Sequence, residues 1–309
     1  MIVPLPTDIP RYYGLIVNGI LNINKPWGKT SFSIVAIVKR LTGEQHAGHA
    51  GTLDPTATGV LPICLGRGTR VIEFLMDASK TYRAEIELGV ATDTYDASGR
   101  ITQREDPSGI SRDQLEWGLT SFRGLIRQTP PMYSAVKHQG KPLYKLARAG
   151  ITVERRSRSA KVHDLALVDW QSPVATVEVV CGKGTYIRSL AHDLGQTLGC
   201  GANLKSLIRL RYGLFNIMDS VSVPQLEDAF HSDYWQHFVY PIDSVLSQWS
   251  AIVVSDDTGQ SIRNGHPLVL ETRPSSENRC RAYALDGRFL GVLRFNPERG
   301  QWQPEKVFL

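Results

Sequence analysis

The sequence predicts an α+β protein, and three observations lead to this fold class. Apolar residues recur with helical spacing in some segments and alternate with polar residues in others. The two kinds of segment follow no regular strand–helix rhythm, and past residue 250 the pattern changes to short alternating runs. The chain has 309 residues, of which 42% are hydrophobic, so it is long enough for about two domains with a substantial core.

The N-terminal region is predicted to hold a strand and then a helix. A short apolar run over Leu15–Ile23 favours a strand. Within residues 31–43, apolar side chains lie at positions i, i+3, i+4 and i+7, with Thr30 or Ser31 as the cap and Gly43 as the stop. This spacing predicts a helix of about three turns.

A glycine- and proline-rich segment and a clear strand follow. Residues 48–62 read GHAGTLDPTATGVLP, in which three glycines and two prolines predict a structured loop rather than a long regular element. From Tyr82 to Val90 apolar and polar residues alternate. We expect a strand there, with Tyr82 at the start of its apolar face.

The middle of the chain contains two further helical patterns and another strand. Ser111–Phe122 is amphipathic at helical spacing, and Val174–Val180 is typical of a strand. The turn at residues 182–184 then opens a helix, for which Thr185 is the expected cap. Its apolar face comprises Ile187, Leu190, Ala191 and Leu194.

The C-terminal part is predicted to be a small β domain. Turn dipeptides at Asn264-Gly265 and Asp286-Gly287 separate its short alternating runs. We therefore divide the chain into a loose proline-rich tail over 1–12, a main domain over 13–249 and a small domain over 250–309.

Composition narrows the class of protein. No run approaches the ~20 consecutive apolar residues that cross a bilayer, and the start MIVPLPTDIP lacks the basic and apolar regions of a secretion signal. We expect a cytoplasmic protein without membrane contact. The four cysteines are widely spaced and form no CxxC pair, so we interpret them as reduced and structural.

The charge is unevenly distributed. The formal net charge is +5, from 35 basic and 30 acidic residues. Residues 137–161 hold eight basic residues against one acidic residue, a net charge of +7 that leaves the remainder at −2. A charge run is often only a solvated face, but one that outweighs the whole chain is typical of a basic arm that binds phosphates.

Several common catalytic motifs are missing. The sequence contains no GxGxxG after a strand, no GxxxxGKS/T, no HExxH and no GxSxG. The acidic run over Asp93–Gly99 lacks the alternating ligands and the terminal Glu of an EF-hand, so a polar turn is favoured over a calcium site. We expect an activity without cofactor or metal.

Asp54 is the most unusual residue of the 48–62 loop. A carboxylate held ionised in a crowded pocket can act as a covalent nucleophile, and Gly51 and Gly59 would let the backbone approach a ligand closely. The alternative is that Asp54 only caps the turn before Pro55, and from spacing alone that structural role is favoured.

Arg188 and Tyr82 are the other two candidate catalytic residues. Arg188 lies in the first turn of its predicted helix, where the macrodipole disfavours a cation, so we expect an anionic partner, either a surface acid or a buried catalytic carboxylate. Tyrosines at positions such as Tyr82 are usually part of the core, although a ring at a strand end also suits stacking on a nucleobase.

Taken together, the motifs resemble one family, the bacterial tRNA pseudouridine-55 synthases of the TruB type. The resemblance runs in order from Leu21 to about Phe215. Its blocks are NINKPWGKTS (22–31), GHAGTLDPTATGVLP (48–62), SKTYRAEIELGVATDTYDASG (79–99), PPMYSAVKHQGKPLYKLAR (130–148), GTYIRSLAHDLG (184–195) and LKSLIRLRYGLF (204–215).

The resemblance implies roles for individual residues. Asp54 corresponds to the catalytic aspartate, Arg188 to the arginine that pairs with it, and Tyr82 to the tyrosine that stacks on the uracil and serves as a base in the final deprotonation. Tyr186 and Leu207 would line the base pocket. The remaining expected substrate contacts are His49, Lys25, Lys137, Lys141 and Lys145.

The resemblance also implies an architecture and a partner. We expect a mixed, largely antiparallel sheet flanked by helices, a basic thumb insertion over about 131–158, and a PUA-like RNA-binding domain at the C-terminal end. The implied activity is isomerisation of the T-loop uridine, U55, to pseudouridine without a cofactor. The implied partner is the T-arm of tRNA, bound by a monomer.

Two other functions are compatible with parts of the sequence. A non-catalytic RNA-binding or tRNA-folding protein would use the basic arm and the C-terminal domain but would not need Asp54 with Arg188. A glycoside hydrolase would need a second carboxylate about 5 to 9.5 Å from the first. The 48–62 loop offers only one carboxylate.

Overall fold

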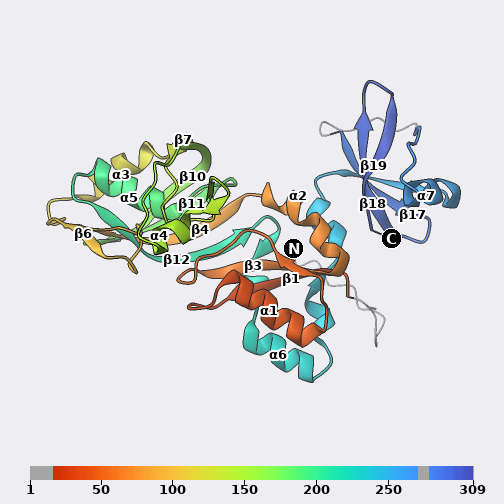
Figure 1. Cartoon of the computed structure of the whole chain (residues 1–309), viewed down its shortest axis with the longest axis horizontal. Helices are drawn as coiled ribbons and strands as arrows, with labels where there is room; N and C mark the ends of the chain where they lie inside the picture. Colours follow the sequence, from red (N-terminus) through yellow and green to blue (C-terminus); the bar gives the residue numbers. More distant parts are fainter. Residues whose placement is uncertain (1–16, 271–277, 309) are drawn as a thin grey trace.

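The computed structural model describes residues 17–270 and 278–308, which form a large mixed sheet with helices around it and a smaller separate sheet (Figure 1). The predicted α+β class is confirmed. The expected tail over 1–12 lies outside the described residues.

The large sheet has eleven strands in the order β14-β1-β3-β12-β4-β11-β10-β7, with β15, β2 and β13 beside β1, β3 and β12. Two pairings, β1 with β14 and β3 with β12, are parallel, and the others are antiparallel. The strands are β1 (Gly19–Lys25), β2 (Ala47–His49), β3 (Thr58–Leu65), β4 (Lys80–Leu88), β7 (Gly124–Gln128), β10 (Arg158–Gln171), β11 (Val174–Cys181), β12 (Ala202–Tyr212), β13 (Phe215–Asn216), β14 (Val221–Ser222) and β15 (Val239–Tyr240).

Helices α1 (Ser31–Thr42) and α6 (Val223–His231) lie together against the β1–β3 part of the sheet (Figure 1). The predicted cap is Thr30, whose hydroxyl accepts a hydrogen bond from the amide of Ser33, and Gly43 ends α1 in the left-handed conformation. The short helices η1 (Gly66–Val71), α2 (Ile72–Met76), η2 (Ile217–Asp219), η3 (Trp235–Phe238) and η4 (Ile242–Leu246) complete this region.

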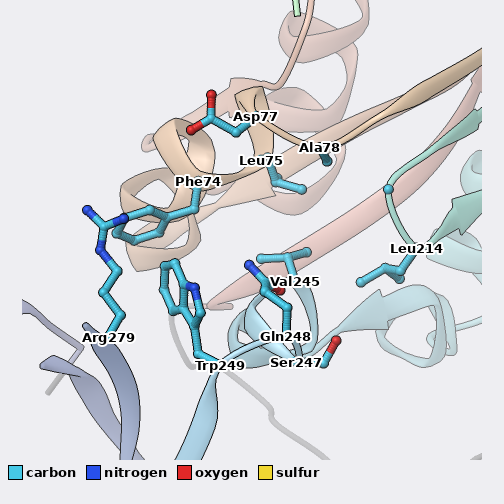
Figure 2. Close-up of a pocket in the computed structure, with 11 residues that line it drawn as sticks. Phe74, Leu75, Asp77, Ala78, Leu214, Val245, Ser247, Gln248, Trp249 and Arg279 are labelled. Atoms are coloured by element: carbon cyan, nitrogen blue, oxygen red, sulfur yellow. The ribbon is translucent and has the colours of Figure 1, made fainter. Parts of the chain in front are cut away.

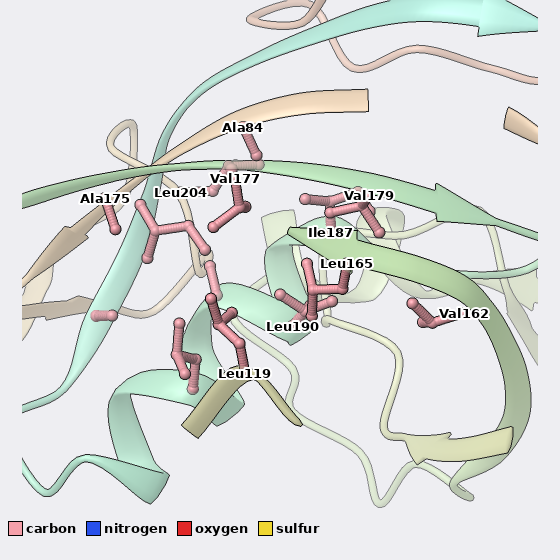
Figure 3. Packing of buried hydrophobic residues seen from close by; sticks show 14 of the residues in the cluster. Ala84, Leu119, Val162, Leu165, Ala175, Val177, Val179, Ile187, Leu190 and Leu204 are labelled. Carbon is pink, nitrogen blue, oxygen red and sulfur yellow. The ribbon is translucent and has the colours of Figure 1, made fainter. Parts of the chain in front are cut away.

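Helices α3 (Arg112–Thr120) and α5 (Ile187–Thr197) pack on the other half of the sheet. Their apolar faces meet those of β4, β10, β11 and β12 in a continuous core, which includes Leu119, Leu190 and Val177 (Figure 3). The expected cap of α5 was wrong. The hydroxyl of Thr185 donates to the carbonyl of Gly182, and α5 begins after Tyr186 without a side-chain cap.

The prediction of a loop over 48–62 is correct only for its centre. Residues 58–62 belong to the buried strand β3, and residues 47–49 form β2. Gly59 lies within this central strand, where a glycine is required by the close approach of the neighbouring strand. Its φ is +98°, and a Cβ would collide with the backbone of Arg209 in β12, so Gly59 allows close approach of a neighbouring strand, not of a ligand as predicted.

Two small hairpins project from the large sheet. Strands β5 (Val90–Thr92) and β6 (Ile101–Arg104) flank the polar turn predicted at 93–99. Strands β8 (Lys137–His138) and β9 (Lys141–Pro142), followed by α4 (Leu143–Arg148), lie within the expected thumb segment.

The C-terminal region forms a separate four-stranded sheet, in the order β16-β17-β18-β19, with one helix (Figure 1). The elements are β16 (Ser250–Val254), α7 (Asp256–Arg263), β17 (Arg279–Ala284), β18 (Phe289–Asn296) and β19 (Gln301–Val307). The predicted turn at Asp286-Gly287 joins β17 to β18. The predicted turn at Asn264-Gly265 instead ends α7, since glycine also stops helices.

This small sheet is docked on the main body. The guanidinium of Arg279 lies 5.4 Å from the ring centre of Phe74 and 5.3 Å from that of Trp249. These three side chains line one side of a cavity of about 610 Å³, whose other walls come from α2, the turn at 213–214 and residues 245–248 (Figure 2). The two sheets therefore share a packed junction rather than a bare linker.

All four cysteines are free and buried, as predicted. Among the described residues, no helix combines the length and the apolar character that crossing a bilayer requires.

Candidate active site

The central feature is the loop that joins β2 to β3 and carries Asp54. The hydroxyl of Ser31 bonds both backbone groups of Leu53, accepting from the amide at 2.9 Å and donating to the carbonyl at 3.1 Å. The carbonyl of Pro55 accepts from the amide of Gly28 at 2.8 Å, and the amide of Ala57 bonds the Asp54 carbonyl at 3.1 Å. These backbone bonds close the turn and leave the Asp54 carboxylate available for another partner.

That partner is Arg188 on α5. Oδ2 of Asp54 lies 3.0 Å from Nη2 of Arg188, and the arginine side chain is only 8% exposed. Nη2 also donates to the carbonyl of Tyr133 at 2.9 Å. The anionic partner expected from the position of Arg188 in the first helical turn is therefore found, and it is the loop carboxylate.

A second carboxylate, Asp96, approaches the same guanidinium. Its Oδ2 lies 3.6 Å from Nη1 of Arg188. Its Oδ1 accepts hydrogen bonds from Thr94 and Ser98, which hold the side chain inside the 93–99 turn. The sequence pattern indicates a polar turn here but does not reveal the role of Asp96, because its partner is almost a hundred residues away in the chain.

Opposing influences act on the Asp54 carboxylate. Its side chain is 39% exposed because it lines an open cavity, while protein atoms crowd it on its other sides. Burial raises the pKa of Asp54 above its ordinary value, the nearby Arg188 opposes that rise, and the negative charge of Asp96 adds to it. Arg188 is therefore the main group that favours the ionised form.

Lys25, predicted as a substrate contact, has a different position. It is fully buried, and its ammonium donates to the carbonyls of Pro26, Lys29 and Pro55. Burial lowers the pKa of Lys25 to about 8, against the attraction of Asp54. Because three backbone carbonyls take up its three protons, Lys25 holds the Asp54 loop in this structure and presents no free donor to a ligand.

Aromatic and apolar side chains form the rest of the cavity wall. Tyr82, Tyr186 and Leu207 all line it, as expected. Tyr82 comes from β4 and Leu207 from the adjacent strand β12. Tyr186 is fixed by Gln128, whose side-chain amide bonds both its amide and its carbonyl. Burial raises the pKa of Tyr82, so its phenol is neutral at neutral pH.

Two cations that the sequence analysis did not single out also line the cavity. Arg209 is 1% exposed and donates to the carbonyls of Val60 and Gly51. Lys80 donates to the carbonyl of Met76, and burial lowers its pKa to about 8. Lys80 lies on β4 and Arg209 on β12, within two of the family motifs. The alternation of apolar and polar residues along a strand does not tell whether a basic side chain is buried or exposed to solvent.

His49 and the thumb lysines take different places. His49 lies on β2 and is not among the residues that line the cavity, and burial lowers its pKa. Lys137, Lys141 and Lys145 are exposed on β8, β9 and α4. Other side chains of the same segment, among them Tyr133, Tyr144 and Arg148, line the cavity directly.

The cavity measures about 970 Å³, which is large enough for a nucleotide and its neighbours. The carboxylate of Asp54, paired with a guanidinium that also approaches Asp96, faces a wall that includes aromatic and apolar side chains. The described residues contain no group of three or more His, Cys, Asp or Glu that could hold a metal ion. The arrangement offers a carboxylate held by a guanidinium in a pocket whose wall combines aromatic, apolar and charged side chains.

Two sequence families match this chain. Residues 39–187 match the TruB family pseudouridylate synthase (N terminal domain), and residues 188–247 match the tRNA pseudouridylate synthase B C-terminal domain. A protein of Dehalococcoides mccartyi named tRNA pseudouridine synthase B is 45% identical over 95% of this chain and 97% of its own. The protein of the same name from Clostridium tetani is 42% identical over 81% and 85%.

The chain belongs to the TruB family of pseudouridylate synthases. The resemblance inferred from the sequence motifs is therefore confirmed, and so is the enzyme class, an isomerase.

Solved structures of this wider fold are similar over most of the chain. The structure titled "Crystal Structure of a Cbf5-Nop10-Gar1 Complex" superposes with a TM-score of 0.75 at 25% identity, covering 94% of this chain and 85% of that one. A second, titled "Structure of H/ACA RNP bound to a substrate RNA containing 2'-deoxyuridine", gives a TM-score of 0.71 at 23% identity, covering 94% and 85%. The pseudouridine synthase fold, with its small C-terminal sheet, is confirmed.

Proposed function

We propose that this TruB-family enzyme isomerises the T-loop uridine of tRNA, U55, to pseudouridine, with Asp54 as its catalytic carboxylate. The observation that carries the proposal is the Asp54–Arg188 pair, whose closest atoms are 3.0 Å apart in a cavity that can hold a nucleotide. The relatives named tRNA pseudouridine synthase B support tRNA as the substrate.

The reaction rearranges one nucleoside without gain or loss of atoms. The bond from N1 of the uracil to C1′ breaks, the base turns within the pocket, and C5 bonds to C1′. The proton of C5 passes to a base, and N1 gains a proton in its place, so the atoms balance without a cofactor. Asp54 would attack the uracil, attack the sugar or remove a sugar proton, and each course needs its carboxylate ionised.

Arg188 supplies the charge that keeps Asp54 ionised. Without it, a carboxylate in this pocket would tend to take up a proton, because burial penalises the charged form. Arg188 is itself held by Tyr133 and Asp96, so the guanidinium is preorganised before substrate enters.

The other residues of the wall would receive the flipped base. Extruding a nucleotide from a folded loop costs a few kcal/mol, which stacking on an aromatic ring can offset. We assign that stacking to Tyr82, with Tyr186 and Leu207 on either side. The same residue is assigned the base role in the final deprotonation, and Tyr82→Phe, which keeps the ring and loses the hydroxyl, separates the two roles. His49 is assigned to neighbouring nucleotides outside the cavity.

The basic thumb would hold the RNA backbone. Lys137, Lys141 and Lys145 are exposed beside thumb residues that line the cavity, which suits contact with T-arm phosphates. We assign 13–249 to catalysis and 250–309 to a PUA-like RNA-binding domain. We also assign a monomer as the acting species, and tRNA as substrate supports a cytoplasmic location.

The test is a single-turnover assay of tritium release from tRNA labelled at C5 of its uridines. We expect Asp54→Asn to abolish release while RNA affinity stays within about tenfold, since an amide keeps the loop shape and loses only the charge. The matched control is Glu116→Gln, which breaks an exposed glutamate–arginine pair on α3 and should leave the rate unchanged.

Turnover by Asp54→Asn would remove Asp54 from the mechanism. A wild-type protein that binds tRNA tightly and releases no tritium would instead support the non-catalytic RNA-binding alternative.

A further inference from the structure

The 93–99 turn touches helix α5 at two points. Asp96 approaches Arg188, as described above. One residue earlier, the ring of Tyr95 stacks on the imidazole of His192, with ring centres 3.9 Å apart and planes 12° apart. Arg188 and His192 are four residues apart on α5, so they lie on the same face of the helix, one turn apart. The turn therefore engages one helical face through two adjacent side chains.

Tyr95 has an unusual backbone. Its φ is +66°, in the left-handed region that bulky L residues rarely adopt. Backbone hydrogen bonds on both sides fix it, because the amide of Leu204 bonds the Tyr95 carbonyl and the amide of Ala97 bonds the Leu204 carbonyl, each at 3.0 Å. Backbone conformations of this kind, which are unfavourable in isolation and are maintained by surrounding contacts, cluster at functional sites.

This backbone turn aims the next side chain. With Tyr95 in the left-handed conformation, Asp96 points into the turn, where Oδ1 accepts from Thr94 and Ser98 and Oδ2 faces Arg188. The stack on His192 fixes the position of the turn relative to the helix, which hydrogen bonds within the turn cannot do. Neither Tyr95 nor His192 lines the cavity, so neither is placed to touch substrate.

We propose that the Tyr95–His192 stack is a positioning pair, which holds Asp96 against Arg188 and thereby orients the guanidinium toward Asp54. The inference rests on the proposed function. It adds Tyr95 and His192, which would act on Asp54 only through Asp96 and Arg188. The stacked imidazole suits this role: its Nδ1 is buried without a hydrogen-bond partner in the described structure, and its ring lies face to face with that of Tyr95.

The decisive variant is Tyr95→Asn. Asparagine tolerates a positive φ, so the turn keeps its shape and only the ring is lost. We expect Tyr95→Asn and His192→Ala each to lower the single-turnover rate about tenfold, with tRNA affinity within about twofold. The double variant should lose no more than either single one, because both remove the same contact.

Conservative and distant variants provide the controls. Tyr95→Phe and His192→Phe keep a stacked pair and should restore the rate to within about twofold of wild type. Tyr234→Ser removes an exposed tyrosine ring that lies outside the turn and α5 and should leave the rate unchanged. In an Asp96→Asn background, Tyr95→Asn should have little further effect, because the route through Asp96 is already broken.

Three results would overturn the proposal. They are a rate within twofold of wild type for Tyr95→Asn, a full further loss in the Asp96→Asn background, or failure of both phenylalanine variants to restore the rate although thermal melting shows them folded. An active wild type with any of these results leaves the proposed function intact. A wild type that releases no tritium from tRNA removes both proposals.

Discussion

At the scale of single residues, the site depends on a balance of three charges. Asp54 is partly desolvated, Arg188 favours its ionised form, and Asp96 disfavours it while also holding Arg188 in place. Asp96 therefore has two opposing effects on the same carboxylate. The direct charge effect should dominate the pH dependence of the rate, whereas the positioning of Arg188 should dominate the maximal rate.

The pH profile of Asp96→Asn tests this balance. Since the negative charge of Asp96 raises the pKa of Asp54, its removal should lower that pKa, and the acid limb of the rate profile should move to lower pH. The plateau rate should fall because Arg188 loses a partner. The measurement is the single-turnover rate against pH for both proteins.

Asp93→Asn is the matched control, since Asp93 lies in the same turn but pairs with Arg100. Its acid limb should coincide with that of wild type. An acid limb of Asp96→Asn that moves to higher pH would contradict the assigned charge effect.

These residues also show what a sequence can and cannot predict. The position of Arg188 at a helix start implied an anion nearby, and the motif containing Asp54 supplied it. Asp96 and Arg209 went unrecognised because their roles come from contacts across the fold, with α5 and with the carbonyls of Gly51 and Val60. For Lys25, the sequence motif did not reveal that its ammonium group donates hydrogen bonds to backbone carbonyls.

At the scale of elements, the register of two strands assembles the cavity wall. Tyr82 pairs with Arg209 and Ala84 with Leu207 between β4 and β12, so the ring, the guanidinium and the apolar side chain are neighbours. The strand patterns of β4 and β11 were predicted correctly because they alternate cleanly. The strand β3 was not, since its glycine and its proline are typical of loops and only pairing with β1 and β12 reveals it.

The thumb is the element that most directly tests RNA binding. Lys137, Lys141 and Lys145 form no ion pair within the described structure, so their charges are available to phosphates. Changing all three to Gln should weaken tRNA affinity and flatten its salt dependence by about two units in the log–log slope, about 0.7 per lost contact. The measurement is the dissociation constant at several salt concentrations.

A triple Gln variant of Arg40, Arg104 and Arg112 is the control. It removes the same charge from exposed positions outside the thumb and should leave the slope near that of wild type. An equal change of slope in the two triple variants would mean that the thumb acts only through the overall charge.

At the scale of the whole molecule, the two sheets share a core. Val292 and Phe308 from the small sheet are buried in the same cluster as Val71 and Leu75 of the main body. Arg67 adds a hydrogen bond to the carbonyl of Phe308, and the ring of Phe308 packs beside that of Phe289 at 5.2 Å. A junction that is apolar at its centre should make the two parts unfold together, unlike domains joined only by a linker.

Phe308→Ala tests this coupling. Phe308 is 7% exposed, and truncating a buried phenylalanine costs about 3–5 kcal/mol. Because the cavity opens at the junction and leaves each sheet's own core intact, calorimetry should show the single transition of wild type splitting into two. The control is Lys306→Ala, which removes only a partly exposed ion pair with Glu73, worth up to about 1 kcal/mol, and should preserve one transition. Two transitions already present in the wild type would show that the small sheet is thermodynamically independent of the site it adjoins.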